Sequence, residues 1–208
     1  MGQHLYTYND PPNEKHLAQA VHVLENDGVI AYPTEGLWAF GCDPRSRKAM
    51  EKIRLLKPYH PKEQPFSMLC SSISMASHIG AVRPSLYRLL KKAWPGPYTV
   101  LLSATRELPK QLREKRKVVG IRIPQLDMLR ALVEKFGRPI ATTSVPAHDE
   151  QEIRFGYQVY ESYGHGVDLL LDLGEEGPGI PSTVIDMSTD EISIVREGLG
   201  DTSMFGLS

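Results

Sequence analysis

Apolar residues recur at helical spacing in five segments of the chain. In the first segment, Leu17, Val21 and Leu24 share one face of a helix, and Gly28 follows as a typical helix stop. The second helix ends before Pro58. This periodicity, which is weaker in the last segment, predicts helices over Glu14–Asp27, Ser46–Lys57, Ser85–Trp94, Leu126–Phe136 and Glu150–Tyr163.

Short, continuously apolar runs lie between these helices and are typical of buried strands. They predict strands over Val29–Pro33, Phe66–Cys70, Tyr98–Ser103, Val118–Ile123, Pro139–Thr143, Val167–Leu171, Thr183–Asp186 and Ile192–Val195. Apolar strands that alternate with helices favour an α/β fold around a mixed sheet. No repeat or low-complexity linker divides the chain, so we expect one domain over residues 1–208. The segment Gly174–Pro181 is rich in glycine and proline. We expect it to be a mobile connection between two strands rather than a domain boundary.

The composition limits the class of protein. Hydrophobic residues make up 41% and charged residues 24% of the 208 positions, as in soluble globular proteins. The apolar runs are too short to cross a membrane, and the polar N-terminus lacks the pattern of a secretory signal. Two cysteines, Cys42 and Cys70, argue against a disulfide scaffold and favour a reducing, cytoplasmic location. The net charge of −1 gives no overall attraction to nucleic acid, so RNA binding would need a local patch.

Three cations stand at positions that suggest a ligand site. Arg122 lies inside the apolar strand Val118–Ile123, where a charge must be paired or must face a cleft. We favour the cleft because a guanidinium suits carboxylate and phosphate, and the alternative is a side chain that points to solvent. Arg196, at the end of the strand Ile192–Val195, has the same two interpretations. Lys57 is either a last-turn cation that interacts with the helix dipole or a phosphate ligand.

Hydroxyl groups flank the predicted strands at three places. Thr34 follows a Tyr-Pro pair at a strand end, and Ser144 and Ser182 lie at strand edges near proline. Each hydroxyl either caps turn backbone or contacts a ligand. Asp172 and Asp186 also follow strands, but a carboxylate there more often caps a turn than holds magnesium, so no metal site is predicted from the residues.

A basic run interrupted only by Glu114 contains Lys110, Arg113, Lys115, Arg116 and Lys117. Such a run is ordinarily solvated surface. If it lies beside a nucleotide cleft, it would instead meet the phosphates of a nucleotide or of RNA. Lys115, Arg116 and Lys117 are the candidate RNA patch.

Seven segments in order along the chain carry a further pattern: Tyr32-Pro33-Thr34, Gly41-Cys42-Asp43-Pro44, Trp94-Pro95-Gly96-Pro97-Tyr98-Thr99, Val119-Gly120-Ile121-Arg122-Ile123-Pro124, Thr142-Thr143-Ser144, Pro181-Ser182-Thr183-Val184-Ile185-Asp186 and Arg196-Glu197-Gly198. With them the chain resembles the YrdC-like family of threonylcarbamoyl-AMP synthases, and most closely its YciO-like branch. The resemblance implies a single-domain α/β fold, in which helices flank a twisted mixed β-sheet with a concave ligand cleft. It also implies a reaction that turns L-threonine, bicarbonate and ATP into threonylcarbamoyl-adenylate and pyrophosphate, for modification of an adenosine in tRNA.

The resemblance further implies roles for the candidate residues. ATP and its phosphates would be bound by Lys57, Ser144 and Arg196, and threonine by Thr34, Arg122 and Ser182. Lys57 and Arg122 would be catalytic, since cations are needed where negative charge accumulates. Magnesium would accompany ATP, because the departing pyrophosphate needs its charge neutralised. The expected partners are ATP, L-threonine and, through the basic run, double-stranded RNA or tRNA, but not a membrane.

Two positions depart from the family's signature, which is Lys-x-Arg after the second helix and Ser-x-Asn after a central strand. Lys57 and Ser144 open these motifs, but Tyr59 replaces the arginine and Pro146 replaces the asparagine. Pro146 offers neither an amide side chain nor a backbone N–H. Tyr59 offers one hydroxyl where a five-donor cation is expected. The alternative is therefore an RNA- or nucleotide-binding protein of the same fold with little or no synthase activity.

Overall fold

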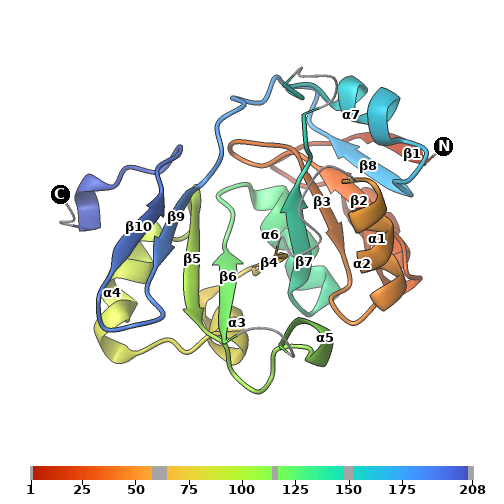
Figure 1. Cartoon of the computed structure of the whole chain (residues 1–208). Helices are drawn as coiled ribbons and strands as arrows, with labels where there is room; N and C mark the ends of the chain where they lie inside the picture. The colour runs from red at the N-terminus through yellow and green to blue at the C-terminus, as the bar shows by residue number, and fades with distance from the viewer. Residues whose placement is uncertain (1, 58–64, 114–116, 148–151, 206–208) are drawn as a thin grey trace.

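The fold is built on a ten-stranded mixed sheet with helices on both faces (Figure 1). The computed structural model describes residues 2–57, 65–113, 117–147 and 152–205. The strands lie in the order β1-β8-β2-β3-β7-β4-β6-β5-β9-β10. Their bounds are β1 (Gln3–Tyr6), β2 (Ile30–Tyr32), β3 (Ala39–Cys42), β4 (Ser67–Leu69), β5 (Tyr98–Ser103), β6 (Val118–Arg122), β7 (Ile140–Ser144), β8 (Leu169–Asp172), β9 (Thr183–Asp186) and β10 (Ser193–Arg196).

Strand pairing confirms the predicted mixed sheet. β8 runs parallel to β1 and β2, β4 to β6, and β5 to β9, and the other neighbours are antiparallel. The register places Tyr32 opposite Ala39, and Ala39 opposite Ser144. The chain leaves β2 at Thr34, and β7 ends at Ser144. The register places both of these points at the same end of their strands, along one edge of the sheet.

The helices of the described residues are α1 (Glu14–Glu25), α2 (Arg47–Leu55), α3 (Ile73–Ile79), α4 (Pro84–Ala93), α5 (Lys110–Arg113), α6 (Asp127–Phe136) and α7 (Gly156–Tyr163), with a 3-10 turn, η1 (Ser203–Phe205). The longest of them, α1, has 12 residues, and none of these helices combines the length and the apolarity that crossing a membrane requires.

Alternating side chains of the sheet build two apolar layers. In β2, Ile30 and Tyr32 pack with α1 and α6, whereas Val29 and Ala31 belong to the layer that holds α2, α4 and α7. Successive side chains of a strand point to opposite faces, so a strand that is apolar throughout must be covered on both. This explains why the strands read as continuous apolar runs.

Local signals set the bounds of the helices. Asn13 accepts the backbone N–H groups of Lys15 and His16 at the start of α1, and Ser46 caps the start of α2. Gly137 ends α6 in the left-handed conformation, with φ of 73°. The predicted helix over Ser46–Lys57 therefore begins and ends inside its expected range, with Lys57 beyond the last turn.

Besides the 3-10 turn η1, four elements were not predicted, and each has a weak sequence pattern. β1 is a short edge strand with a largely polar sequence, and β3 lies inside the glycine-flanked stretch after Thr34. α3 is rich in serine, which ordinarily favours turns. α5 has only four residues.

Candidate functional site

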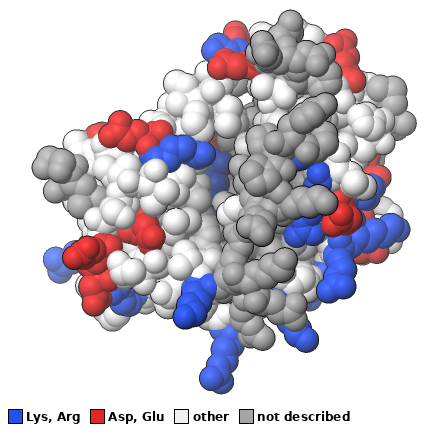
Figure 2. All heavy atoms as spheres, viewed as in Figure 1, with Lys and Arg blue, Asp and Glu red and all other residues white. Residues whose placement is uncertain are grey.

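Five of the candidate residues lie at or next to the ends of strands of the sheet, of which β9 and β10 are neighbours. Thr34 follows β2, Arg122 ends β6, Ser144 ends β7, Ser182 precedes β9 and Arg196 ends β10. Figure 2 shows that the molecule is hollowed between the side that carries β9 and β10 and the opposite side, with Lys or Arg atoms inside the hollow. The contacts described next connect these strand ends to one another.

Arg122 is paired with Glu35, which lies in the loop after β2. Arg122 Nη2 donates to Glu35 Oε2 over 3.2 Å, and the two side chains are 14% and 9% exposed. The other oxygen of Glu35 accepts the backbone N–H of Gln125. Arg122 Nε is buried and has no hydrogen-bond partner among the described residues. Of the two situations expected for this charge, a partner or a cleft, the structure shows the partner, and one buried N–H of the guanidinium is left over.

Arg196 lies close to Arg122 in the same site. Its Nη2 and Nε donate to the carbonyl oxygen of Ser182 over 2.8 and 3.2 Å. Burial lowers the pKa of the Arg196 guanidinium, and the positive charge of Arg122 lowers it further. Two guanidinium groups therefore lie close together, and Glu35 is the one carboxylate among the described residues that pairs with either of them. A bound anion would reduce their mutual repulsion.

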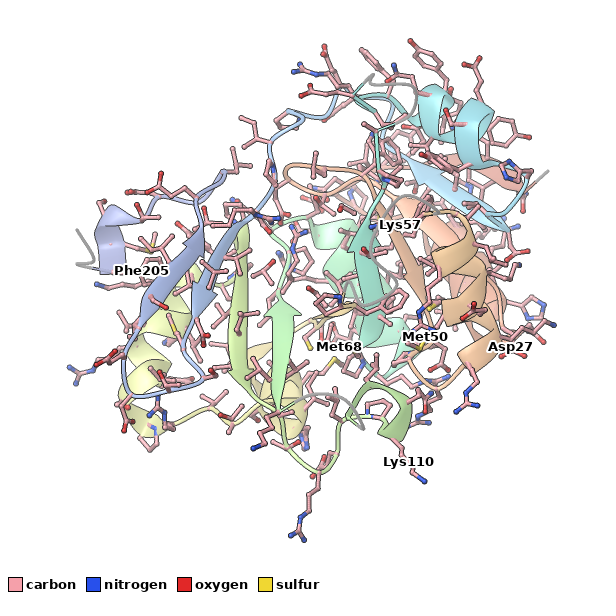
Figure 3. All side chains as sticks on the ribbon, viewed as in Figure 1. Asp27, Met50, Lys57, Met68, Lys110 and Phe205 are labelled. Carbon is pink, nitrogen blue, oxygen red and sulfur yellow. The ribbon has the colours of Figure 1, made fainter. Side chains whose placement is uncertain are left out.

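Lys57 is a buried cation between α2 and β7 (Figure 3). Its side chain is directed at β7, where Nζ donates to Thr143 Oγ1 and to the carbonyl oxygen of Ser144, each over 2.8 Å. No ion pair joins it to a described carboxylate, and burial lowers its pKa to about 8. The helix-dipole interpretation does not fit this geometry, because α2 ends at Leu55 and the ammonium group contacts a strand.

The three candidate hydroxyls differ in their surroundings. Thr34 Oγ1 donates to the carbonyl oxygen of Leu37 over 2.6 Å and accepts the N–H of Gly36, as in a turn. Ser182 is buried, and its Oγ lies 2.9 Å from Thr99 Oγ1. Ser144 is exposed at the end of β7, beside Lys57. Ser144 therefore has a hydroxyl open to a ligand, whereas Thr34 already uses its proton within the chain.

The loop Gly174–Pro181, expected to be a mobile connection, makes backbone hydrogen bonds to the loop after β2 and to Arg154. The N–H of Gly179 donates to the carbonyl oxygen of Gly36 over 3.2 Å, and Gly177 N–H to that of Arg154 over 2.8 Å. Trp38 Nε1 also donates to Arg154 O, over 3.0 Å. A Cβ on Gly36 would lie 2.0 Å from Ile180 O. The glycines here permit close backbone approach rather than freedom of movement.

At the two departures from the signature, the structure describes one position. Pro146 lies just beyond β7, and its carbonyl oxygen accepts Tyr163 Oη over 3.2 Å. No amide side chain is available there for a ligand. Tyr59 lies outside the described residues.

The basic run lies away from these strand ends. Lys110 begins α5 before β6, whereas Arg122 is the last residue of β6, so the run and the guanidinium occupy opposite ends of one strand. The condition for phosphate contact, a position beside the cleft, is therefore not met by the described part of the run. Lys117 is exposed, and Lys115 and Arg116 lie outside the described residues. The RNA patch stays a prediction.

The described residues contain no group of three His, Cys, Asp or Glu side chains that could hold a metal ion. Asp172 Oδ2 contacts His4 Nε2 over 2.8 Å, and Asp186 accepts the N–H of Ser188. Burial raises the pKa of both Cys42 and Cys70 to about 12, which keeps these thiols protonated. The chemistry of the site therefore rests on its cations and hydroxyls.

Glu35 is the site residue that sequence reasoning missed. An acidic residue in the loop after Thr34 was visible in the sequence, and Arg122 was known to need a partner. The missing information was the fold, which brings the loop after β2 to the end of β6.

Comparison with known proteins identifies similar chains. Residues 22–198 match the family model Sua5_yciO_yrdC, described as "Telomere recombination". The chain is 35% identical to "Uncharacterized protein YciO" of Escherichia coli K12, over 99% of this chain and 100% of that protein. It is 32% identical to a threonylcarbamoyl-AMP synthase of Marinobacter nauticus, over 86% of this chain and 95% of the synthase.

Solved structures agree with these matches. The crystal structure of E. coli YciO superimposes with a TM-score of 0.90 at 34% identity, over 99% of this chain and all of that one. Sua5 of P. abyssi, in a crystal structure with L-threonine, superimposes with a TM-score of 0.80 over 95% of this chain and 57% of Sua5. At 23% identity, this second likeness shows the fold alone.

Proposed function

The chain belongs to the Sua5/YciO/YrdC family, and from this premise we propose that it is a nucleotide-binding enzyme of the threonylcarbamoyl-AMP synthase type. The reaction joins L-threonine, bicarbonate and ATP to give threonylcarbamoyl-adenylate, pyrophosphate and water. Its product would serve the threonylcarbamoyl modification of tRNA. A relative named threonylcarbamoyl-AMP synthase, with nearly its full length matched, supports the proposal.

The observation that carries the proposal is the buried ammonium group of Lys57. It is 6% exposed, and among the described residues it donates only to two neutral oxygens of β7. A buried charge without a counter-ion is costly, and burial already lowers its pKa. A phosphate group of ATP beside Ser144 would supply the missing negative charge. We therefore assign Lys57 and Ser144 to the phosphates.

The second half of the proposed site surrounds Arg122. Arg122, Arg196 and Ser182 form a connected polar cluster whose one described acidic member is Glu35. In our proposal, the threonine carboxylate approaches Arg122 and competes with Glu35 for the guanidinium. Ser182 orients the amino acid, and Thr34 shapes the turn that presents Glu35. Arg196 neutralises phosphate charge across the site.

Magnesium enters this proposal together with ATP. The described residues offer no cluster of three acidic or imidazole ligands. Magnesium commonly binds through substrate phosphates, water and one or two carboxylates. A magnesium ion that arrives with ATP therefore does not need a cluster of protein ligands. When bound, the ion would neutralise the charge that accumulates on the departing pyrophosphate.

The test is a direct assay of the purified protein with ATP, magnesium, L-threonine and bicarbonate. Pyrophosphate and threonylcarbamoyl-adenylate are measured together, since both must form in equal amounts. Lys57→Met should lower the rate by about 100-fold, the order expected when a group that stabilises developing charge is lost. Lys52→Met is the matched control, because Lys52 lies in α2 but pairs with Asp168 on the surface. No product, together with no binding of ATP, would reject the proposal.

A second candidate function is nucleotide or RNA binding with little or no synthesis. Pro146 favours it, because no amide side chain is present where the family's signature has asparagine. In this case ATP would bind at Lys57, but no adenylate would form. RNA binding through Lys115, Arg116 and Lys117 would fall in the triple alanine variant, with a flatter salt dependence. Unchanged affinity and salt dependence would mean that the basic run is ordinary surface.

A further inference from the structure

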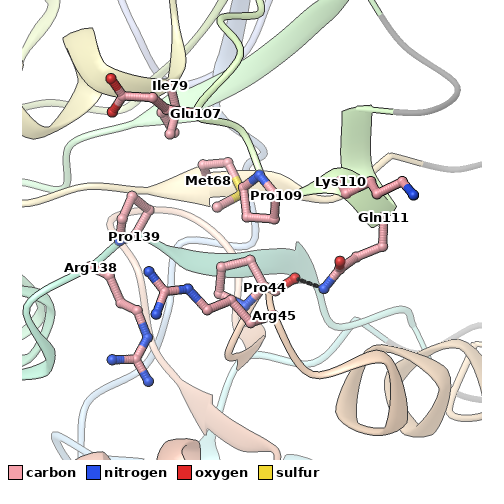
Figure 4. Close-up of a pocket in the computed structure, with 10 residues that line it drawn as sticks. All are labelled: Pro44, Arg45, Met68, Ile79, Glu107, Pro109, Lys110, Gln111, Arg138 and Pro139. Atoms are coloured by element: carbon pink, nitrogen blue, oxygen red, sulfur yellow. Dashed lines mark hydrogen bonds between the residues drawn. The ribbon is translucent and has the colours of Figure 1, made fainter.

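A second pocket lies at the other end of β7 from Ser144 and Lys57 (Figure 4). It has a volume of about 230 Å3 and opens between the segment after β3, the start of β7 and α5. Pro139 lines it immediately before β7, whereas Ser144 is the last residue of that strand. The pocket is therefore separate from the site proposed for ATP and threonine.

Two guanidinium groups occupy one wall of this pocket. The Arg45 side chain is exposed, and its guanidinium has no hydrogen-bond or ion-pair partner among the described residues. Arg138 donates from Nε and Nη2 to Asp43 Oδ2 over 3.2 and 2.7 Å, and its guanidinium stacks 4.0 Å from the ring of Phe136. Figure 4 shows the Arg45 and Arg138 side chains on the same side of the pocket, with the Arg138 guanidinium directed away from Met68, Ile79 and Pro109.

Arg138 is held in place by its contacts, and part of its donor set remains available. Asp43 takes the Nε and Nη2 edge, and Nη1 has no partner among the described residues. A guanidinium that is fixed in advance loses little entropy when it binds a planar or tetrahedral anion. The acidic residue of the pocket, Glu107, has a side-chain contact with His78 at 3.2 Å, and Figure 4 shows its carboxylate turned away from both arginines.

The remaining lining combines polar residues, Glu107, Lys110 and Gln111, with an apolar part. Pro44, Pro109 and Pro139 line it together with the buried side chains of Met68 and Ile79. Pockets for drug-sized ligands measure roughly 300–1,000 Å3, so a pocket of about 230 Å3 suits a smaller molecule. Such walls favour a ligand that has an apolar part next to its charge.

We propose that this pocket binds a small organic phosphate monoester. The phosphate dianion contacts the guanidinium groups of Arg45 and Arg138. Asp43 offsets one of these two positive charges, so the pair remains net positive beside the phosphate. The carbon part of the ligand lies against Met68 and the prolines. Nothing in this proposal depends on the chemistry at Lys57, since the residues of the two sites do not overlap.

The experiment is a titration of the isotope-labelled full chain with n-propyl phosphate, followed by two-dimensional amide NMR. We expect shifts at Arg45, Gln111 and Arg138 that saturate with one ligand, and weaker binding of inorganic phosphate because it lacks the apolar part. Propyl phosphate can also bind the cations of the site proposed for ATP, so the shifted residues must be assigned. Shifts confined to residues around Lys57 and Ser144 would overturn the proposal.

Variants of exposed side chains make the test specific. Arg45→Ala should weaken binding at the pocket by about tenfold or more, as expected for hydrogen bonds to a charged group. Its backbone N–H, which donates to Asp43 Oδ1, is retained, so the fold is preserved. Lys48→Ala removes an exposed cation three residues away that does not line the pocket, and should leave affinity within twofold. Equal losses of affinity in both variants, or no loss of affinity in Arg45→Ala, would show that this pocket has no specific phosphate site.

Discussion

Glu35 and Arg122 meet although 87 positions separate them in the sequence, with Arg122 Nη2 donating to Glu35 Oε2 over 3.2 Å. The loop after β2 thereby contacts the end of β6. Arg196 lies near enough for its pKa to be lowered by the charge of Arg122. The carboxylate of Glu35 thus balances a site that otherwise gathers positive charge, and its removal has a definite consequence.

We expect Glu35→Gln to lower the free energy of unfolding by about 1–3 kcal/mol, because it leaves a largely buried guanidinium without its counter-charge. Urea denaturation measures the change. Added phosphate should restore part of the loss by supplying negative charge to Arg122. Glu51→Gln is the control, since Glu51 pairs with Arg54 on the exposed face of α2, and a change below about 0.5 kcal/mol is expected. Equal stability of the two variants would contradict the importance of the buried pair.

The pKa of Lys57, lowered to about 8 by burial, predicts a pH-dependent affinity for ATP. Only the ammonium form attracts phosphate. As pH rises above 8, the affinity of the natural protein should fall by up to tenfold per unit, as linkage requires. Lys57→Met should bind ATP weakly with little change between pH 8 and 9.5. Calorimetric titration at several pH values checks both expectations.

The same lysine also affects the stability of the ligand-free protein. In the unfolded chain its pKa returns to about 10.4, so between pH 8 and that value the unfolded state holds more protons at this position. This contribution to the free energy of unfolding must therefore increase as pH rises through that range. The difference between natural protein and Lys57→Met isolates it. A difference that does not vary with pH would mean that Lys57 titrates normally.

Much of the sheet was predictable because its strands are apolar on both faces. Runs such as Tyr98–Ser103 and Val118–Ile123 have the length and composition of buried strands, and the structure has β5 and β6 at these positions. β1 was missed because it is an edge strand whose side chains are exposed or half-buried, so its sequence lacks the apolar run of a buried strand. β3 was missed because Gly41 interrupts its apolar run.

The site was predictable residue by residue but not in its connections. A charge in an apolar strand led us to expect a partner or a cleft for Arg122, and the structure shows a partner. The identity of that partner depended on which loops meet, and no local pattern contains this information. The loop Gly174–Pro181 shows the same limit, because its composition is that of a mobile linker, whereas Ile180 in this loop lies in close approach to Gly36 of the loop after β2. Tertiary contact decides between these two uses of glycine.

That close approach predicts a strong effect for Gly36→Ala. The added Cβ would lie 2.0 Å from the backbone oxygen of Ile180, so the loop must move away from the site. We expect a loss of about 1–3 kcal/mol, the cost typical of overpacking, and weaker binding of L-threonine. Thermal denaturation and threonine titration measure the two effects.

Gly137→Ala is the matched control for this prediction. Gly137 has φ of 73° and open space around its Cβ position, so alanine there costs only about 1–2 kcal/mol of backbone strain. It should leave threonine affinity unchanged. Loss of affinity in both variants would show that lower stability alone weakens binding, and would remove the loop from the site.

The last prediction concerns the two positions that depart from the family's signature. Pro146 has no amide side chain and no backbone N–H, and Tyr59 has one hydroxyl in place of a guanidinium. Loss of a donor that stabilises developing charge typically costs about 100- to 1,000-fold in rate. We therefore expect the natural protein to make threonylcarbamoyl-adenylate slowly, and Tyr59→Arg with Pro146→Asn to raise the rate at saturating ATP and threonine by at least tenfold.

Each single variant has its own expected outcome, because proline also restricts the segment after β7. Pro146→Asn alone should loosen the segment after β7, which offsets part of the gain in rate from the new amide side chain. Tyr59→Arg does not alter that segment. The contact of Tyr163 Oη with the carbonyl oxygen of residue 146 does not require proline and should survive in the variant. A natural protein as fast as a relative with the full signature would show that these donors are unnecessary here. A double variant that folds and binds ATP but gains no rate would mean that the site is shaped for another substrate.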